Sequence, residues 1–302
     1  MERDEKYIKV SGGLGNQMFQ YAFSKALQKR LSNCDVYLDL YWYTLIRKPL
    51  LENQQFSADF TPRDYELELF PNVKPKFVSQ DVVRKYFAQH SRPNMTQQEA
   101  LEEKVIAEEN AFEYDEKLFA IQPKRFFSGY YQNEAYFKDF KEELKKDFEL
   151  PEFDKKDKHN QKLLKEIQSS NSVMIHLRRG DYLRLDYALP VDYYKKAAQY
   201  IAERVKKPKF FVFGTESDEF IKKEFKIGHS FKFVGNENTR NGEDWKDLKL
   251  MQACKHAIIA NSTFSWWAAW LSDYDGKIVT APSPWLDDND GCICQNWVKI
   301  YR

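Results

Sequence analysis

The first forty residues alternate between short apolar runs and one helical pattern. Residues 7–11 (YIKVS) and 36–40 (VYLDL) are runs rich in strand-forming residues. Between them, residues 17–31 carry apolar side chains at the spacing of one helix face: Phe19, Phe23, Ala26, Leu27 and Leu31. The order strand, loop, helix and strand predicts the opening of a parallel α/β unit.

The second half of the chain shows the same alternation more plainly. Four short apolar runs are typical of strands, at residues 172–177, 209–213, 257–260 and 277–281. Three segments have the pattern of helices, at residues 192–206, 243–255 and 263–271. Repeated strand–helix units of this kind predict a doubly wound parallel sheet.

The middle of the chain is less regular. Residues 50–125 carry few clean periods and several polar clusters, so we expect helices, loops and an insertion there. Residues 134–148 (EAYFKDFKEELKKDF) predict an amphipathic helix with a charged outer face, which Pro151 ends. Residues 152–160 (EFDKKDKHN) then predict a charged, solvated connector.

The connector predicts a boundary between two domains. The first would span residues 1–155, with the irregular insertion inside it, and the second residues 156–302. A chain of 302 residues is long enough for two ordinary domains. Two α/β halves with a cleft between them are the simplest architecture for this pattern.

Charge and composition exclude several classes of protein. The 47 Lys and Arg residues nearly balance the 46 Asp and Glu residues, whereas nucleic-acid binders usually carry a basic excess. No apolar run is long enough for a signal peptide or a membrane span, so we expect a soluble, cytoplasmic protein. Peripheral contact with the inner face of the membrane, through exposed aromatic residues, stays compatible with this. Cys292 and Cys294 are too close for the usual zinc spacing, and we expect no structural metal.

A glycine turn separates the first expected strand from the first expected helix. Residues 11–17 (SGGLGNQ) contain three glycines, which allow positive φ angles and a close approach of the backbone to a ligand. The helix that follows would point free N–H groups outward. Asn16 and Gln17 replace the Lys and Ser or Thr of a phosphate loop, and Met18 replaces the third glycine of a dinucleotide fingerprint. A ligand-facing loop and a plain tight turn fit this motif equally well.

Two adjacent arginines follow the expected strand at residues 172–177. In His176-Leu-Arg-Arg-Gly-Asp-Tyr182, Arg178 and Arg179 would lie at the carboxyl end of a parallel strand, the usual ligand edge of such a sheet. Side-chain alternation places His176 and Arg178 on one side and Arg179 elsewhere. Guanidinium groups bind phosphate bidentately, so a diphosphate would neutralise the pair. Ion pairing with Asp181 is the alternative.

A third motif covers residues 247–271 and predicts a helix, a buried strand, a loop and a helix. Asn261, Ser262 and Thr263 supply amide and hydroxyl groups where the last helix begins. Side-chain caps together with free N–H groups there would make a good anion site. Asp247, near the start of the preceding helix, either favours the helix dipole or accepts hydrogen bonds from a base.

Several aromatic residues are candidates for stacking on a sugar. Core packing is the favoured interpretation for each of them: Trp42, Tyr130, Tyr131, Trp266, Trp267 and Trp270.

At the three motifs the chain closely resembles the α-1,2-fucosyltransferases, enzymes that move L-fucose from GDP-fucose to the 2-hydroxyl of a galactose. GGLGNQMFQ, HLRRGDY and NSTFSWWAAWL look like motifs of that family, in the family's order, near the start, middle and end of the chain. The resemblance implies two Rossmann-like domains facing across a cleft (a GT-B-type fold). It assigns residues 1–155 to the acceptor side and residues 156–302 to the GDP-sugar.

The same resemblance implies roles for single residues. Arg178 and Arg179 would hold the diphosphate, and His176 would line the nucleotide pocket. Asp247 would accept hydrogen bonds from the N1–H and 2-amino groups of guanine. The donor-binding set is completed by six residues, of which the two glycines would face the sugar: Gly13, Gly15, Asn261, Ser262, Thr263 and Phe264.

The catalytic set implied by the resemblance is Arg178, His176, Asn16 and Asp186. Asn16 would orient the sugar or the acceptor through its amide. Asp186 follows Asp181 at a spacing similar to that of a proposed base in core-fucosylating relatives, whereas His176 and Asp181 are nearer the motif. A loose, oxocarbenium-like transition state needs little help from a base, so the identity of the base, and the need for one, stay open.

The sequence therefore predicts an inverting galactoside α-1,2-fucosyltransferase that uses neither metal nor cofactor. Its partners would be GDP-β-L-fucose and a galactose-terminated oligosaccharide, with no nucleic acid. Two alternatives remain: a glycosyltransferase that uses another GDP-sugar, and a GDP-sugar-binding protein without turnover.

Overall fold

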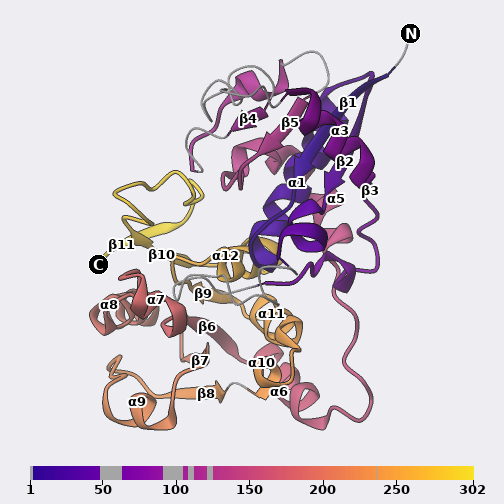
Figure 1. Ribbon diagram of the computed structural model, residues 1–302. Coiled ribbons are helices and arrows are strands. Elements are labelled where there is room, and N and C mark those ends of the chain that lie inside the picture. The colour runs from indigo at the N-terminus through magenta and orange to yellow at the C-terminus, as the bar shows by residue number, and fades with distance from the viewer. Residues whose placement is uncertain (1–2, 48–62, 91–104, 108–111, 121–124, 236) are drawn as a thin grey trace. The chain divides into compact units, whose positions relative to one another are not determined.

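The chain forms two compact units, Met1–Glu149 and Leu150–Arg302 (Figure 1). The computed structural model describes residues 3–47, 63–90, 105–107, 112–120, 125–235 and 237–302. Each unit holds one sheet whose paired strands all run parallel, with helices packed on it. The α/β class predicted from the alternation of strands and helices is confirmed.

The N-terminal unit has a five-stranded sheet in the order β3-β2-β1-β5-β4. Its strands are β1 (Asp4–Lys9), β2 (Cys34–Asp39), β3 (Lys76–Phe77), β4 (Val105–Ala107) and β5 (Arg125–Ser128). In the centre, Ile8 of β1 pairs with Leu38 on one side and Phe127 on the other. The strand order reverses between β1 and β5, where ligands of open parallel sheets usually bind.

Helix α1 (Leu14–Arg30) contributes strongly to the core of this unit, since twelve of its 17 residues are buried. Further helical segments of this unit include η1 (Trp42–Arg47), η2 (Leu67–Leu69), α3 (Gln80–His90) and η3 (Glu116–Phe119). Tyr131 is fully buried and stacks on Phe23 with ring centroids 3.9 Å apart. Core packing, favoured for Tyr131, is therefore confirmed, whereas Tyr130 is 37% exposed.

The continuous helix predicted for residues 134–148 is wrong. The segment breaks into η4 (Glu134–Tyr136), η5 (Lys138–Phe140) and α5 (Lys141–Asp147). Phe137 leaves the helical region, with φ −138°, and both Tyr136 and Phe137 are fully buried. Their rings meet Phe23 and Phe19 of α1 at centroid distances of 5.2 and 5.8 Å. Aromatic packing thus overrides the helical period.

The glycine turn after β1 is held by side chains of the helix that follows it. Only Gly12 takes a positive φ, +80°, while Gly13 has φ −81° and Gly15 lies inside α1, which corrects the expectation for three flexible glycines. Gln17 Nε2 donates to the carbonyls of Gly12 (3.0 Å) and Asp64 (2.7 Å).

Gln20 connects the same turn to the end of β5. Its Oε1 accepts from the Ser11 N–H (3.1 Å), and its Nε2 donates to the Gly129 carbonyl (2.9 Å). The turn therefore lies where the strand order of this sheet reverses, and both buried glutamines fix its shape.

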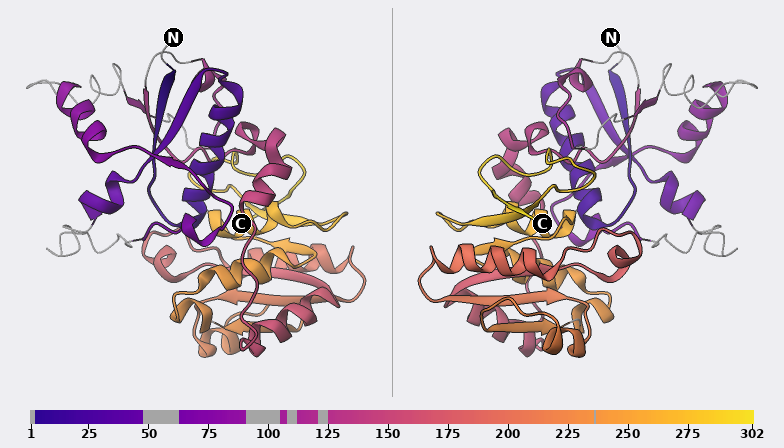
Figure 2. Two further views of the ribbon diagram at one scale, coloured as in Figure 1. Left: turned by 90° about the vertical axis from the view of Figure 1, so that its right-hand side faces the viewer. Right: turned by 90° about the vertical axis from the view of Figure 1, so that its left-hand side faces the viewer.

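The C-terminal unit, drawn from rose through orange to yellow in Figure 2, has a six-stranded sheet in the order β11-β10-β9-β6-β7-β8. The strands are β6 (Asn171–Leu177), β7 (Pro208–Gly214), β8 (Phe231–Gly235), β9 (His256–Ile258), β10 (Val279–Ser283) and β11 (Val298–Tyr301). In chain order the first three strands extend from the centre to one edge and the last three to the other. This is the strand order of a Rossmann fold, with its reversal between β6 and β9.

Two sets of helices cover the two faces of this sheet (Figure 1). The face with Val173, Ile175 and Leu177 packs against α8 (Val191–Ala202) and α9 (Asp218–Lys223). The other face carries α6 (Lys158–Gln168), α11 (Asp244–Gln252) and α12 (Thr263–Leu271), of which α11 contacts both others. The short helices α7 (Gly180–Arg184) and α10 (Glu237–Arg240) follow β6 and β8.

The elements predicted for this half are present, whereas β8, β11, α6 and the short helices α7, α9 and α10 were not expected. Helix α12 has the predicted bounds, and Trp266, Trp267 and Trp270 are buried core residues. Helix α6 begins inside the predicted connector, because the Asp157 side chain accepts from the Asn160 N–H (3.0 Å) and caps the helix.

Gly12 provides the stability prediction from this fold. A Cβ added at Gly12 would lie 2.6 Å from Asn16 Nδ2, and φ +80° is unfavourable for any L side chain. We expect Gly12→Ala to destabilise the protein by about 1–2 kcal/mol, measured as a lower Tm in calorimetry. The matched control is Gly13→Ala, because its Cβ would meet nothing closer than 3.6 Å. Equal Tm values for the two variants would contradict this reading of the turn.

Candidate functional site

The candidate site lies at the carboxyl edge of the C-terminal sheet. Residues 176–179 are at the end of β6, and residues 261–264 follow β9 and begin α12. Strands β6 and β9 are hydrogen-bonded neighbours, and the strand order reverses between them. Two motifs far apart in the sequence therefore meet at the position where Rossmann sheets bind nucleotides.

Hydrogen bonds tie these two segments together. The Tyr182 hydroxyl donates to the Asn261 carbonyl (3.1 Å), and Asn261 Nδ2 donates to the Tyr187 carbonyl (3.0 Å). The loop after β6 is thus anchored to the start of α12. The sequence placed Tyr182 within the arginine motif but did not indicate this anchoring role.

Arg178 is held in place while part of its guanidinium stays available. Its Nη2 lies 2.7 and 2.8 Å from the two carboxylate oxygens of Asp181, and its guanidinium carbon lies 5.1 Å from the centre of the Tyr182 ring. Its Nε is buried and has no hydrogen-bond partner among the described residues. Ion pairing with Asp181, the alternative considered above, is present but leaves Nε for a ligand.

Arg179 points to the opposite face of the sheet. Its guanidinium lies over the Phe220 ring of α9 at 4.0 Å, and its Nε is 3.6 Å from a Glu216 oxygen. That distance is an ion pair but too long for a hydrogen bond. The separation of Arg179 from His176 agrees with the alternation predicted along the strand.

His176 is buried and neutral. Its ring faces the Phe264 ring of α12 at a centroid distance of 6.0 Å. Burial, and then the charge of Arg178, lower the pKa of His176 to about 3. The imidazole therefore carries no charge at neutral pH, and its Nδ1 finds no partner in the described part of the chain.

The start of α12 offers backbone donors without a side-chain cap. The N-cap residue is Ser262, whose hydroxyl makes no capping hydrogen bond, so the side-chain cap expected from the sequence is wrong. The first N–H groups of α12 keep the partial positive charge of a helix N-terminus. Asn261 is 1% exposed, and its buried Oδ1 has no partner in the described ranges.

Four buried polar atoms at this edge have no hydrogen-bond partner among the described residues. They are His176 Nδ1, Arg178 Nε, Arg179 Nε and Asn261 Oδ1. Because buried polar atoms nearly always have partners in folded proteins, such a group is typical of a site whose ligand supplies them.

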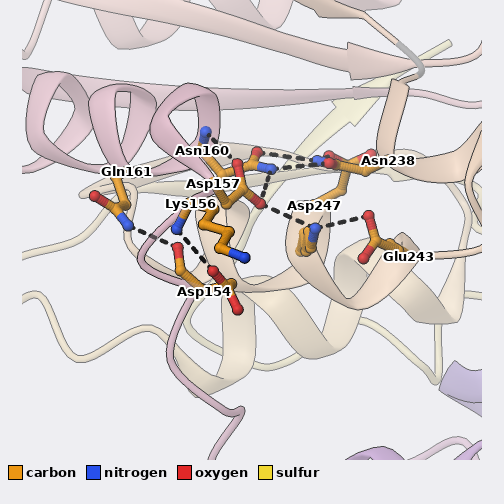
Figure 3. A network of polar contacts seen from close by, with 9 residues as sticks. Asp154, Lys156, Asp157, Asn160, Gln161, Asn238, Glu243 and Asp247 are labelled. Atoms are coloured by element: carbon orange, nitrogen blue, oxygen red, sulfur yellow. Dashed lines mark hydrogen bonds and ion pairs between the residues drawn. The ribbon is translucent and has the colours of Figure 1, made fainter.

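Asp247 lies in the first turn of α11, within a buried polar network (Figure 3). Asn238 of α10 donates from Nδ2 to Asp247 Oδ1 at 2.6 Å, and Asn238 and Asn160 pair through their amides. Burial raises the pKa of Asp247 to about 6, an effect that the hydrogen bond from Asn238 opposes and the charge of Asp244 reinforces. Neither Asn160 nor Asn238 carried a sequence signal, because each is an isolated polar residue.

Of the other predicted site residues, one follows α7 and three belong to the N-terminal unit. Asp186 is exposed, with φ +57°, in the turn after α7, and within the described part of the chain no hydrogen bond or ion pair joins it to residues 176–179. Gly13, Gly15 and Asn16 belong to the N-terminal unit, where Gln132 Nε2 donates to Asn16 Oδ1 (3.0 Å). Their roles, and that of Asp186, stay predictions.

The described residues hold neither a cluster of metal ligands nor a membrane-spanning helix. No three His, Cys, Asp or Glu side chains in these ranges come together as metal ligands, and metal independence stays a prediction. None of the described helices is both long enough and apolar enough to cross a membrane.

The chain belongs to glycosyl transferase family 11, the α-1,2-fucosyltransferase family, whose model matches residues 5–300. It is therefore a glycosyltransferase-family protein, as the three motifs indicated.

Two bacterial relatives match nearly the whole chain. An α-1,2-colitosyltransferase of Escherichia coli is 33% identical over 315 residues, covering 97% of this chain and 98% of the relative. The O-antigen biosynthesis glycosyltransferase WbnK of Escherichia coli is 27% identical over 317 residues, covering 97% of this chain and 100% of the relative.

The fold is similar to that of a solved fucosyltransferase. The crystal structure of NodZ from Bradyrhizobium has a TM-score of 0.50 at 13% identity, covering 89% of this chain and 92% of that one. At this identity the similarity concerns the fold alone.

Asp247 provides a prediction on stability and pH. A carboxyl whose pKa rises from 3.8 to about 6 on folding stabilises the fold at low pH and loses that contribution as the pH rises through 6. We expect Asp247→Asn to be more stable than the parent by about 1–3 kcal/mol at pH 7.5, with a smaller difference at pH 5. Urea unfolding at both pH values measures this.

The exposed Asp192, which pairs with Lys196 at 2.7 Å, is the control. Asp192→Asn should show no such gain at pH 7.5. An Asp247→Asn variant less stable than the parent at pH 7.5 would contradict the cost assigned to the buried carboxylate.

Proposed function

We propose that this protein is an inverting galactoside α-1,2-glycosyltransferase that takes its sugar from a GDP donor without a metal ion. The preferred donor is GDP-β-L-fucose, and the acceptor is the 2-hydroxyl of a terminal galactose in a glycan. The observation that carries the proposal is the group of cationic and helix-terminal donors at the reversal point of the C-terminal sheet. Membership of family 11 and the three motifs support the sugar and the linkage.

Glycosyl transfer breaks the bond between the sugar and the diphosphate, so negative charge builds up on the leaving diphosphate. Arg178 would bind it through Nε, Arg179 would add charge from the other face, and the N–H groups of Ser262 and Thr263 would donate to it. Fixed donors of this kind stabilise the transition state without reorganising. Asn261 and Phe264 would complete the walls around phosphate and ribose.

The remaining residues take roles around this diphosphate site. Asp247 would accept from guanine N1–H and the 2-amino group. His176, neutral at pH 7, would hydrogen-bond to the donor through Nδ1 rather than add a charge. In the N-terminal unit, the turn with Gly13 and Gly15 would approach the sugar, and Asn16 would orient the acceptor.

The base that accepts the proton of the acceptor hydroxyl is a separate question. Asp186 is our candidate, because it is exposed on the loop that follows the arginines and is free to approach a bound substrate. A loose transition state would make the base contribute little.

The sugar itself has one close competitor. Colitose is the 3-deoxy form of fucose, and the family relative from Escherichia coli is named for its transfer. The two donors differ by one hydroxyl, so selectivity depends on whether the site hydrogen-bonds the 3-hydroxyl. A site built for that bond discriminates strongly against the sugar that lacks it.

The testing experiment incubates the protein with lactose and, in parallel, GDP-fucose, GDP-colitose and GDP-mannose, with EDTA present. We expect GDP release and a glycosylated lactose with GDP-fucose, with at least about tenfold lower kcat/KM for the other two donors. NMR of the product should show an α linkage to the galactose 2-position.

Each alternative has its own outcome in that experiment. Faster turnover of GDP-colitose or GDP-mannose would change the donor and keep the reaction. Tight GDP binding with no product on any galactose-terminated acceptor would favour a GDP-sugar-binding protein. Loss of activity in EDTA, restored by a divalent cation, would overturn metal independence.

Arg178 gives a second prediction. Arg178→Ala removes the buried Nε donor, so we expect kcat/KM to fall by about 10²–10³, with most of the loss in kcat. The control is Arg204→Ala, because Arg204 is an exposed arginine whose partners among the described residues are its sequence neighbours Tyr200 and Glu203. Near-normal turnover of Arg178→Ala would remove this residue from the diphosphate site.

A further inference from the structure

Two buried asparagines connect Asp247 to the start of α6 (Figure 3). Asn160 Nδ2 donates to Asn238 Oδ1 (3.0 Å), and Asn238 Nδ2 donates to Asn160 Oδ1 (3.1 Å). The second hydrogen on each amide goes to a carboxylate: Asn160 to Asp157 Oδ2 (2.9 Å) and Asn238 to Asp247 Oδ1 (2.6 Å). Both amides are therefore fully used, and neither can rotate by 180° without opposing two acceptors.

The far end of this network is fixed as well. Asp157 caps α6 through the Asn160 N–H and lies 2.9 Å from Lys246 Nζ, which also reaches Glu243 at 2.6 Å. Lys246 is the residue before Asp247 on α11, so the network closes on the helix that carries Asp247. The start of α6, helix α10 and the first turn of α11 are thereby held as one block.

Asp247 has one carboxylate oxygen left over. Asn238 occupies Oδ1, and no donor among the described side chains reaches Oδ2. Lys246 pairs with Asp157 and Glu243 and not with Asp247, and no other cation in the described ranges lies within ion-pair distance of Asp247. Asp244, on the same helix, adds negative charge near the Asp247 carboxylate. Helix α11 contacts α12, and both helices follow strands of the parallel sheet, so the first turn of α11 begins on the same carboxyl side of the sheet as the start of α12.

We propose that Asn238, itself held by Asn160, is a positioning residue that fixes the Asp247 carboxylate for guanine and so sets the base selectivity of the donor site. The proposal rests on the function proposed above. An ionised carboxylate only accepts hydrogen bonds. Guanine presents two adjacent donors, N1–H and the 2-amino group, whereas adenine, cytosine and uracil place an acceptor beside their donor on this edge.

Asn238 acts on both the direction and the charge of the carboxylate. It holds Oδ1, so the plane of the carboxylate cannot rotate away from the base. It also donates a hydrogen bond to the charged form, which opposes the rise in the pKa of Asp247 caused by burial. Without Asn238, Asp247 would take up a proton nearer neutral pH and present a hydroxyl donor to the donors of guanine.

The test compares binding of GDP with binding of inosine diphosphate, which lacks the 2-amino group, by calorimetric titration at pH 7.0 and 8.5. The parent protein should prefer GDP by about tenfold or more. Asn238→Ala should lower the affinity for GDP at pH 7.0 by about tenfold and reduce the preference over inosine diphosphate. Part of the lost GDP affinity should return at pH 8.5, where Asp247 is ionised again.

Two further variants keep the result interpretable. Asn160→Ala leaves the Asn238 donor in place but frees it to rotate, so we expect a smaller loss in the same direction, and it replaces Asn238→Ala if that variant does not fold. Asn171→Ala is the control, because Asn171 lies at the amino end of β6, where its side chain donates to the Lys206 carbonyl. This variant should bind both nucleotides like the parent protein.

The outcomes separate this proposal from the function on which it rests. If the parent protein binds neither nucleotide, the proposed function fails. If the parent prefers GDP, but folded asparagine variants keep the same preference and the same pH dependence, only the positioning role is overturned. A lower Tm without a change in nucleotide preference would make the network purely structural.

Discussion

The parallel pairing of β6 with β9 is the interaction on which the candidate site depends. It joins two segments about eighty residues apart in the chain at one edge of one sheet, where all strand–helix connections of a parallel sheet emerge. The arginines after β6 and the uncapped start of α12 are brought together by this pairing alone. Every further contact at the edge, including the bond from Tyr182 to Asn261, presupposes it.

Several polar groups at that edge are buried, and burying them costs free energy of folding. His176 is forced to be neutral, Asp247 is held close to its ionisation point, and several donors and acceptors are buried without a partner in the described part of the chain. Such groups persist only where the surrounding structure fixes them. In this unit the apolar face under α8 and α9 and the amide network provide that support. The residues that stabilise the fold are therefore different from the polar residues assigned to binding.

The N-terminal unit also places a conspicuous motif where the strand order of its sheet reverses, but the polar groups around this motif are hydrogen-bonded within the protein. Glutamine side chains occupy the backbone groups around its glycine turn. Gln17 and Gln20 therefore have a structural role, because their side chains hold the backbone of the glycine turn. What remains for a ligand is Asn16, whose Oδ1 is bound by Gln132 while its Nδ2 has no partner among the described residues.

The sequence by itself determined the α/β class, the order and approximate position of most strands and helices near the motifs, and the family. These features depend on local periodicity and on residues adjacent in the chain, which one sequence displays directly. Only the tertiary structure decided which glycine takes a positive φ, where the helix at residues 134–148 breaks, and how Asn160 and Asn238 hold Asp247. Each of these depends on contacts between distant residues, such as the 78 positions between the two asparagines, which leave no pattern in a single sequence.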